Sequence, residues 1–186
     1  MSLVRDFAER TVLGLARLGM RLADADQIAE GRDLAARTVS PHIATVTTLS
    51  TIQAWTGCSS FALRGPDGGL AGVIALFPLK PAARATLAAG VLNGVDPPLD
   101  LIARPGDPVI AWYGWGMAGA TWRGRASVMA GAVSLHREIH PDLPLYGRAA
   151  TPGGERTLLK RIGAYPVPGP GGLVTAPPWR RQRKAA

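Results

Sequence analysis

Apolar positions near the N-terminus recur with the period of a helix. A helix is predicted over residues 3–22, with an apolar stripe of Val4, Phe7, Leu15, Leu18 and Leu22. Its basic face can lie on an anionic membrane. Asp6 and Glu9 dilute that charge and favour packing on the domain's own core or on a partner subunit. A second helix is predicted to end near Arg37, capped by Asp24 or Asp26.

After the break at Ser40-Pro41, the segment ATVTTLSTIQAW is compatible with two structures. Its β-branched residues suit a strand, whereas Ser50 can cap a short helix toward Trp55. The pattern leaves these alternatives open. His42 follows the break, and its position favours a structural role over a catalytic one.

Residues 60–80 carry the clearest strand pattern. Ser60–Gly65 and Leu70–Phe77 are apolar runs joined by Pro-Asp-Gly-Gly, in which proline fixes φ and glycine permits positive φ. The pattern predicts an antiparallel hairpin. The longest apolar run, Leu70–Leu79, is too short to span a bilayer and contains Pro78. Cys58 is expected to be a buried, inert thiol.

A short helix is predicted from Pro81 to about Gly90, with proline in its first turn. The proline-rich connection VDPPLDLIARPGDP follows and has little regular pattern. Connections of this length often line or cover a site. A plain surface crossing agrees with the sequence equally well.

The stretch Val109–Ser127, VIAWYGWGMAGATWRGRAS, organises the rest of the chain. Its β-branched and aromatic start, up to Trp115, predicts a buried strand beside the hairpin. A loop of small residues follows, and helical spacing begins at Ser127. Free N–H groups and the positive end of a helix dipole therefore meet beside Arg123 and Arg125, which makes a phosphate-binding corner.

Composition narrows the class of protein without choosing a function. The chain has 186 residues, of which 47% are hydrophobic and 18% charged, so one globular domain is expected rather than disorder. The net charge of +8 favours coenzyme A, nucleic acid or an anionic membrane as partner, although an arginine-rich surface without a partner is equally consistent. A single cysteine excludes an intramolecular disulfide, and charges interrupt any signal-peptide core, so a cytoplasmic location is expected.

The residues Thr121-Trp122-Arg123-Gly124-Arg125-Ala126 resemble the Arg/Gln-x-x-Gly-x-Gly/Ala signature of the GNAT superfamily of acyl-CoA-dependent N-acyltransferases. Gly124 and Ala126 match, whereas Thr121 replaces the usual Arg or Gln. Downstream, Leu145–Thr151 and the helix closing at Gly163 resemble the family's fifth strand and last helix, with an alanine in place of the usual Phe. The resemblance covers roughly residues 60–167.

The resemblance implies an α/β fold of the α+β type. A GNAT-like mixed, mostly antiparallel central sheet flanked by helices is expected, with a helical N-terminal segment. One acyltransferase domain is expected over residues 1–178, followed by a basic tail over 179–186. The implied enzyme transfers an acyl group, most simply acetyl, from acetyl-CoA or another acyl-CoA to an amine by direct attack. The acceptor is a small-molecule or protein amine.

The same resemblance implies a set of site residues. A backbone N–H of Met117 or Ala118 would meet the thioester oxygen. The pyrophosphate would lie against the backbone of Trp122, Arg123, Gly124, Arg125, Ala126 and Ser127. The acceptor amine must also lose a proton, but the central strand has no carboxylate after Asp107, and Leu159 stands where relatives use a tyrosine acid. Tyr113 is therefore the candidate catalytic residue, ahead of Tyr165, with a buried structural tyrosine as the alternative.

Three C-terminal features have their own interpretations. His136 and His140 have the i,i+4 spacing of a metal chelate, but no Cys or carboxylate completes a site, and no metal is expected. Thr151, ahead of proline, is expected to cap the last helix. The tail WRRQRKAA can bind nucleic acid or simply be solvated. A non-catalytic or nucleic-acid-binding protein is the alternative function, and a homo-oligomer is compatible with the sequence.

Overall fold

A seven-stranded sheet lies at the centre of the protein. The computed structural model describes residues 7–179, and the strand order is β1-β2-β3-β4-β5-β7-β6. Strands β4 and β5 are parallel, and every other neighbouring pair is antiparallel. The expected mixed, mostly antiparallel central sheet is confirmed.

The helices and strands follow one another in a mixed order. The strands are β1 (Met20–Leu22), β2 (Ser60–Arg64), β3 (Leu70–Leu79), β4 (Ala111–Gly119), β5 (Leu145–Arg148), β6 (Tyr165–Pro166) and β7 (Leu173–Ala176). The α-helices are α1 (Phe7–Ala16), α2 (Ala25–Thr38), α3 (Val46–Thr56), α4 (Arg84–Ala88), α5 (Trp122–Ser134) and α6 (Pro152–Arg156). Helices α5 and α6 continue into the π-helical turns Leu135–Ile139 and Thr157–Ile162, and the 3-10 turns are Pro81–Ala83 and Leu99–Leu101.

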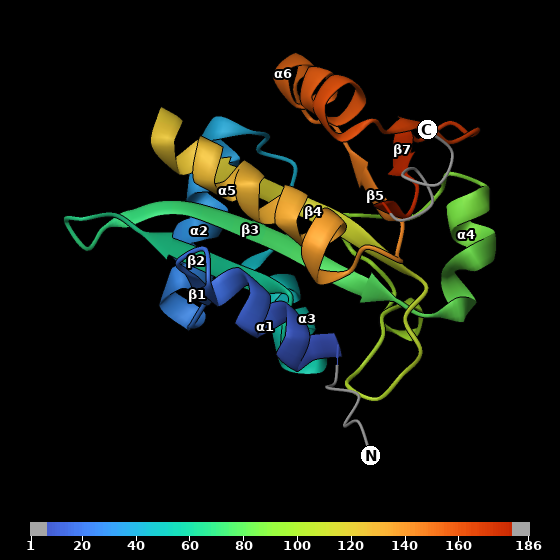
Figure 1. Ribbon diagram of the computed structural model, residues 1–186, viewed down its shortest axis with the longest axis horizontal. Helices are drawn as coiled ribbons and strands as arrows, with labels where there is room; N and C mark the ends of the chain where they lie inside the picture. Colours follow the sequence, from blue (N-terminus) through green and yellow to red (C-terminus); the bar gives the residue numbers. More distant parts are fainter. Residues whose placement is uncertain (1–6, 180–186) are drawn as a thin grey trace.

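Helices cover both faces of the sheet, and α5 crosses one face while α2 lies behind the other (Figure 1). On the α5 side, Leu15 of α1 and Val128 of α5 pack with Trp112 of β4. On the opposite side, Ile52 of α3 packs with Tyr113 of β4. Neighbouring residues of β4 serve different cores because side chains alternate between the faces of a strand.

The N-terminal helix is shorter than the sequence predicts. Helix α1 ends at Ala16, and Gly19 turns the chain at a φ of 77°. The prediction of one helix to residue 22 is therefore wrong for Met20–Leu22, which form β1 and pair with β2. Pairing with the sheet edge outweighs the helical pattern because it buries Met20, which is 1% exposed. Helix α1 packs on the domain's own core through Leu15, and residues 3–6 lie outside the described chain.

The ambiguous segment before the hairpin is helical, as α3. Its cap is Thr45 rather than Ser50, and the Thr45 hydroxyl accepts the N–H of Thr48 at 3.1 Å. Gly57 ends the helix with a φ of 67°, a conformation that glycine adopts without strain. Two local end signals therefore decide in favour of a helix despite the β-branched residues.

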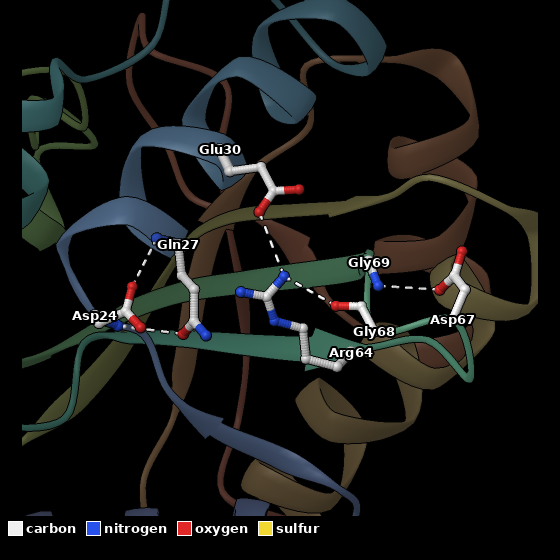
Figure 2. Close-up of polar contacts among 7 residues, drawn as sticks. All are labelled: Asp24, Gln27, Glu30, Arg64, Asp67, Gly68 and Gly69. Atoms are coloured by element: carbon white, nitrogen blue, oxygen red, sulfur yellow. Dashed lines mark hydrogen bonds and ion pairs between the residues drawn. The ribbon is translucent and has the colours of Figure 1, made fainter.

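Helix α2 forms as predicted, and Asp24 caps its start. The Asp24 carboxylate accepts the N–H of Gln27 at 2.8 Å, and the Gln27 side chain accepts the N–H of Asp24 in return (Figure 2). This reciprocal pair satisfies two donors that a helix start leaves open.

The predicted hairpin is confirmed as β2 and β3. In its turn, the carboxylate of Asp67 accepts the N–H of Gly69 at 3.0 Å (Figure 2). Arg64 donates to the carbonyl of Gly68 at 3.1 Å and lies 3.6 Å from a carboxylate oxygen of Glu30 on α2. The turn chemistry fixes the register, and Arg64 connects the hairpin to the helix behind it.

The C-terminal region holds a strand that the sequence pattern did not predict. Residues Leu173–Ala176 form β7, which lies between β5 and β6. The surrounding proline and glycine residues hide this four-residue run in the sequence.

Between residues 7 and 179, no helix is long and apolar enough to cross a membrane.

Candidate functional site

The parallel strands β4 and β5 separate along their length. They pair only over Trp112–Gly114 and Leu145–Gly147. Beyond that point β4 continues to Gly119 along β3, whereas β5 ends at Arg148 and the chain turns toward α6. A bulge lies where the strands part, because Leu76 pairs with Gly114 and Ala75 with Gly116, which leaves Trp115 as the extra residue. A bulge bends a strand and increases its twist.

The backbone of Met117 faces the opening between the separated strands. The N–H of Ala120 donates to the carbonyl of Ala71 at 3.0 Å, so these two residues form a hydrogen-bonded pair of the β3–β4 ladder. Such pairs alternate along antiparallel strands. Ala118 therefore bonds toward Val73, and the N–H and carbonyl of Met117 point away from β3. Of the two candidate N–H groups for a thioester oxygen, only that of Met117 has this direction.

A cavity of about 830 Å³ occupies this opening and continues under α2. Its size is typical of a site for a small molecule or cofactor. It has four walls: α2, the bulged half of β4, the first turns of α5, and the start of the last helix. The lining positions used below are Gln27, Arg32, His42, Asn93, Gly94, Tyr113, Met117, Trp122, Arg125, Ala126, Arg148 and Arg161.

The charge of this cavity is entirely of one sign. Its charged lining residues are Arg32, Arg125, Arg148 and Arg161, with His42 as a further titratable group. Of the residues that the structure describes, no aspartate or glutamate lines it. The cavity therefore offers a favourable electrostatic environment to anions and an unfavourable one to cations.

Helix α5 begins five positions earlier than the sequence pattern predicts. The expected loop is a strand up to Gly119, and the helix starts at Trp122 instead of Ser127. The Thr121 hydroxyl caps it by accepting the N–H of Gly124 at 3.1 Å. The first-turn N–H groups of Trp122 and Arg123 have no partner within the helix, whereas later ones bond inside it. The free backbone N–H groups at this corner are therefore those of Trp122 and Arg123, fewer than the backbone of residues 122–127 that was predicted to bind phosphate.

Gly124 serves the packing of α5 on the sheet. A Cβ at this position would lie 2.0 Å from the carbonyl oxygen of Ala71, and one at Gly119 would lie 2.3 Å from the amide nitrogen of Arg125. Both glycines permit the helix start to approach strands β3 and β4. The resemblance implied that the pyrophosphate lies against the backbone of Gly124, but the side-chain direction of Gly124 is toward the carbonyl of Ala71 on β3.

The predicted coenzyme residues divide into two groups. Met117, Ala118, Trp122, Arg125 and Ala126 line the cavity, whereas Arg123, Gly124 and Ser127 do not. The guanidinium of Arg123 instead lies 5.4 Å from the ring centre of Trp122, which is itself 67% exposed. Arg125 is thus the arginine of this corner that faces the cavity.

Tyr113 lies deep at the point where β4 and β5 part. Its ring stacks on Phe77 with centroids 5.0 Å apart, and the residue is 3% exposed. Burial raises the pKa of the Tyr113 hydroxyl, and the positive charge of Arg148 opposes this rise. The hydroxyl is therefore protonated at neutral pH and suits a hydrogen-bond or proton donor, not a base.

Arg148 and Trp115 hold the loop around Gly90–Gly94, part of which lines the cavity. The Arg148 guanidinium donates to the carbonyls of Gly90 and Leu92, and the Trp115 indole N–H donates to the carbonyl of Gly94. A Cβ on Gly94 would lie 2.6 Å from the Tyr113 hydroxyl oxygen, so the loop runs directly past that group. Within residues 7–179, no carboxylate forms an ion pair with Arg148.

Of the long proline-rich connection, only its first residue, Val95, lines the cavity, next to Asn93 and Gly94, which precede it. The carboxylate of Asp107 accepts the N–H of Arg104 at 3.0 Å within its own turn. The connection therefore lines the site at its start and runs outside the cavity over the rest of its length. Sequence patterns did not indicate Arg32 or Arg148 as site residues, because the packing of α2 and the loop brings them to the cavity.

The two helical histidines lie away from the cavity in the α1–α5 core. The Thr11 hydroxyl donates to the carbonyl of Phe7 at 2.8 Å, so its oxygen accepts from Nε2 of His140 at 2.8 Å. Burial lowers the pKa of His140 to about 4, and nearby Arg10 adds to this effect. Burial, followed by the charge of Arg137, also lowers the pKa of His136. In the described chain, no third His, Cys, Asp or Glu joins them into a group that could hold a metal.

Comparisons with known proteins find matches among solved structures. No protein-family model matches the sequence, and no curated protein does. A crystal structure of histone acetyltransferase HPA2 and related acetyltransferase from Corynebacterium glutamicum is 16% identical, with a TM-score of 0.47 over 86% of this chain and 95% of that one. The GNAT-like decarboxylase GphF, in complex with isobutyryl-CoA, is also 16% identical, with a TM-score of 0.48 over 69% of this chain and 64% of that one.

Proposed function

We propose that the protein binds an acyl-CoA between β4 and β5 and transfers the acyl group to an amine. The observation that carries this proposal is the N–H of Met117, which faces a large cavity at the point where the strands separate. A donor held there by the β3–β4 ladder can stabilise negative charge on a thioester oxygen without reorganising. Acetyl-CoA is the simplest donor.

The coenzyme has features that suit each part of the opening. Its extended arm carries amide groups, which can hydrogen-bond the unpaired edge of β4 as an added strand does. Its phosphates are anionic and suit Arg125 and the first-turn N–H group of Trp122. The small side chain of Ala126 permits the phosphates to approach the start of α5 closely.

The transfer needs one bond formed and one broken. The amine nitrogen attacks the thioester carbon, the C–S bond breaks, and the sulfur leaves with its electron pair. Tyr113 lines the cavity, and its hydroxyl, which is protonated at neutral pH, is the candidate donor to that sulfur. The nitrogen then gives up one proton to solvent or to His42, which is exposed and lines the cavity.

A second function, acyl-CoA binding without transfer, is favoured by the absence of a carboxylate base among the described cavity residues. Most primary amines are protonated at neutral pH, with an ordinary pKa of about 10.4 for a lysine-type amine. A protein that acylates them benefits from a base, and one that only binds the coenzyme needs none.

Calorimetry and a transfer assay together test the proposal. Titration with acetyl-CoA is expected to show binding, and release of free thiol in the presence of an amine is expected to show transfer. Binding without thiol release from any amine would favour the second function. A protein that binds neither coenzyme A nor any acyl-CoA would contradict both functions.

A further inference from the structure

The acceptor side of the cavity carries its own positive charge. Arg125 lies at the start of α5, on the side proposed for the coenzyme phosphates. Arg32 lies on α2, on the opposite face of the sheet, together with Gln27 on the same helix. The phosphates at the α5 corner therefore do not account for Arg32.

We propose that the acceptor is an amine that also carries a carboxylate, and that Arg32 binds this carboxylate. The inference rests on the proposed acyl transfer and adds the chemical class of its second substrate. A free amino acid has this combination of groups, and so do small amines bearing an acidic side chain.

The packing of α2 directs Arg32 to the cavity. A Cβ on Gly31 would lie 2.6 Å from a methyl carbon of Val73, so α2 rests directly on β3 at this point. The neighbouring residue, Arg32, then lies at the rim of the cavity between helix and sheet. Its side chain is 30% exposed, which leaves it within reach of a ligand.

Arg32 has only a weak internal counter-charge. Among the described residues its ion pair is with Asp33, at 3.6 Å, and the Asp33 side chain is 63% exposed. Adjacent residues of a helix do not face each other, and an exposed ion pair contributes little to stability. A ligand carboxylate can therefore replace or join this contact at little cost. An arginine–carboxylate pair with two hydrogen bonds is both stronger and more specific.

The same charges disfavour the usual cationic acceptors. A polyamine or a lysine-rich peptide would bring additional positive charge beside the cavity arginines and find no carboxylate among the described lining residues. Like charges at close range oppose binding. A carboxylate on the acceptor offsets the charge of its own ammonium group and pairs with Arg32.

The test compares acceptors matched in size and differing in charge. Thiol release from acetyl-CoA is measured with β-alanine and β-alaninamide, with L-alanine and L-alaninamide, and with spermidine. We expect the carboxylate member of each pair to have the lower KM and spermidine to be the poorest acceptor. The amine of an amino acid amide is less basic than that of the amino acid, so a larger fraction of it is neutral and reactive at neutral pH. Amine basicity alone would therefore make β-alaninamide, not β-alanine, the better acceptor.

Two matched variants identify the residue. Arg32→Gln and Arg37→Gln each remove one positive charge from α2, but Arg37 is exposed and does not line the cavity. Arg32→Gln is expected to raise the KM for β-alanine about tenfold and to leave that for β-alaninamide unchanged. Arg37→Gln should change neither value. Acetyl-CoA affinity by calorimetry should stay the same in both variants.

Each remaining outcome overturns the inference in a distinct way. Equal or better use of the amides or spermidine would refute the acceptor class while leaving acyl transfer intact. Equal effects of Arg32→Gln and Arg37→Gln would refute the role of Arg32. Acetyl-CoA binding with no turnover of any acceptor would also refute the acceptor class. Absence of acetyl-CoA binding would remove the proposed function and this inference together.

Discussion

Gly124 of α5 and Ala71 of β3 are in such close contact that a Cβ on the glycine would lie 2.0 Å from the alanine carbonyl oxygen. The same carbonyl accepts the N–H of Ala120 at 3.0 Å. One backbone group thus fixes both the end of β4 and the start of α5. This contact positions the corner of the candidate site.

Replacing Gly124 with alanine is expected to destabilise the protein by about 1–3 kcal/mol, because backbone must move to admit the methyl group. Urea denaturation measures the change. Gly153→Ala is the control, since its Cβ would meet only the Thr151 hydroxyl oxygen at 4.0 Å, and helix propensity then favours alanine by about 0.5–1 kcal/mol. A Gly124→Ala protein of unchanged stability that no longer binds acyl-CoA would instead support a phosphate contact.

Arg125→Gln is expected to weaken acyl-CoA binding several-fold, because Arg125 lines the cavity at the start of α5. Arg123→Gln, two residues away and equally charged, should have little effect because Arg123 lies against Trp122 outside the cavity. Calorimetry at low and high salt checks both variants, and the difference between them should shrink as salt screens exposed charges. Equal losses would show that net charge alone attracts the coenzyme.

Tyr113→Phe is expected to lower kcat about 10²-fold while leaving acyl-CoA affinity unchanged, because the ring and its stacking on Phe77 remain and only the proton donor is lost. Tyr146→Phe is the matched control: Tyr146 pairs with Tyr113 across β4 and β5 but does not line the large cavity. Steady-state kinetics distinguishes the two. An undiminished kcat in Tyr113→Phe would exclude it as the donor.

Stability should fall as the pH drops from about 6.5 to about 4. The pKa of His140 is about 4 in the folded protein, against an ordinary value of 6.5, so the unfolded chain binds more protons in this window. The loss is about 3 kcal/mol for His140, is absent above the window and is complete below it. Denaturation at pH 7 and pH 4 measures it. In His140→Gln the slope should be smaller, with a remaining part from His136, and identical slopes would contradict the assignment.

Removing residues 180–186 should leave stability unchanged, whereas removing Trp179 as well should cost about 0.5–1 kcal/mol. The difference reflects the Arg137 guanidinium, which lies 4.2 Å from the centre of the Trp179 ring. Melting temperatures of the two truncated proteins measure it, and acyl-CoA binding serves as the control that should not change. A large loss of melting temperature on removal of residues 180–186 alone would mean that the basic tail itself docks on the domain.

Several elements follow from the sequence because a few neighbouring residues specify them. The β2–β3 hairpin depends on the turn around Asp67 and Gly68, and α2 depends on the reciprocal capping of Asp24 and Gln27. The buried start of β4 follows from its aromatic residues Trp112 and Tyr113. In each case the decisive hydrogen bonds or side chains lie within one short segment.

Other features depend on partners far away along the chain. Met20–Leu22 and Leu173–Ala176 become strands because sheet edges are available to them. The start of α5 is defined by Thr121 as a cap and by the fit of Gly124 against Ala71. Local periodicity contains no information on either contact.

The candidate site shows the same division. The sequence indicated Tyr113 and the Met117–Ala118 backbone on the central strand, and Arg125 near a helix start. Only the tertiary structure decided that Met117, not Ala118, turns its N–H to the opening, since the ladder with β3 sets that alternation. Packing of α2 on the sheet likewise brought Arg32 to the cavity, because burial joins residues that sequence spacing keeps apart.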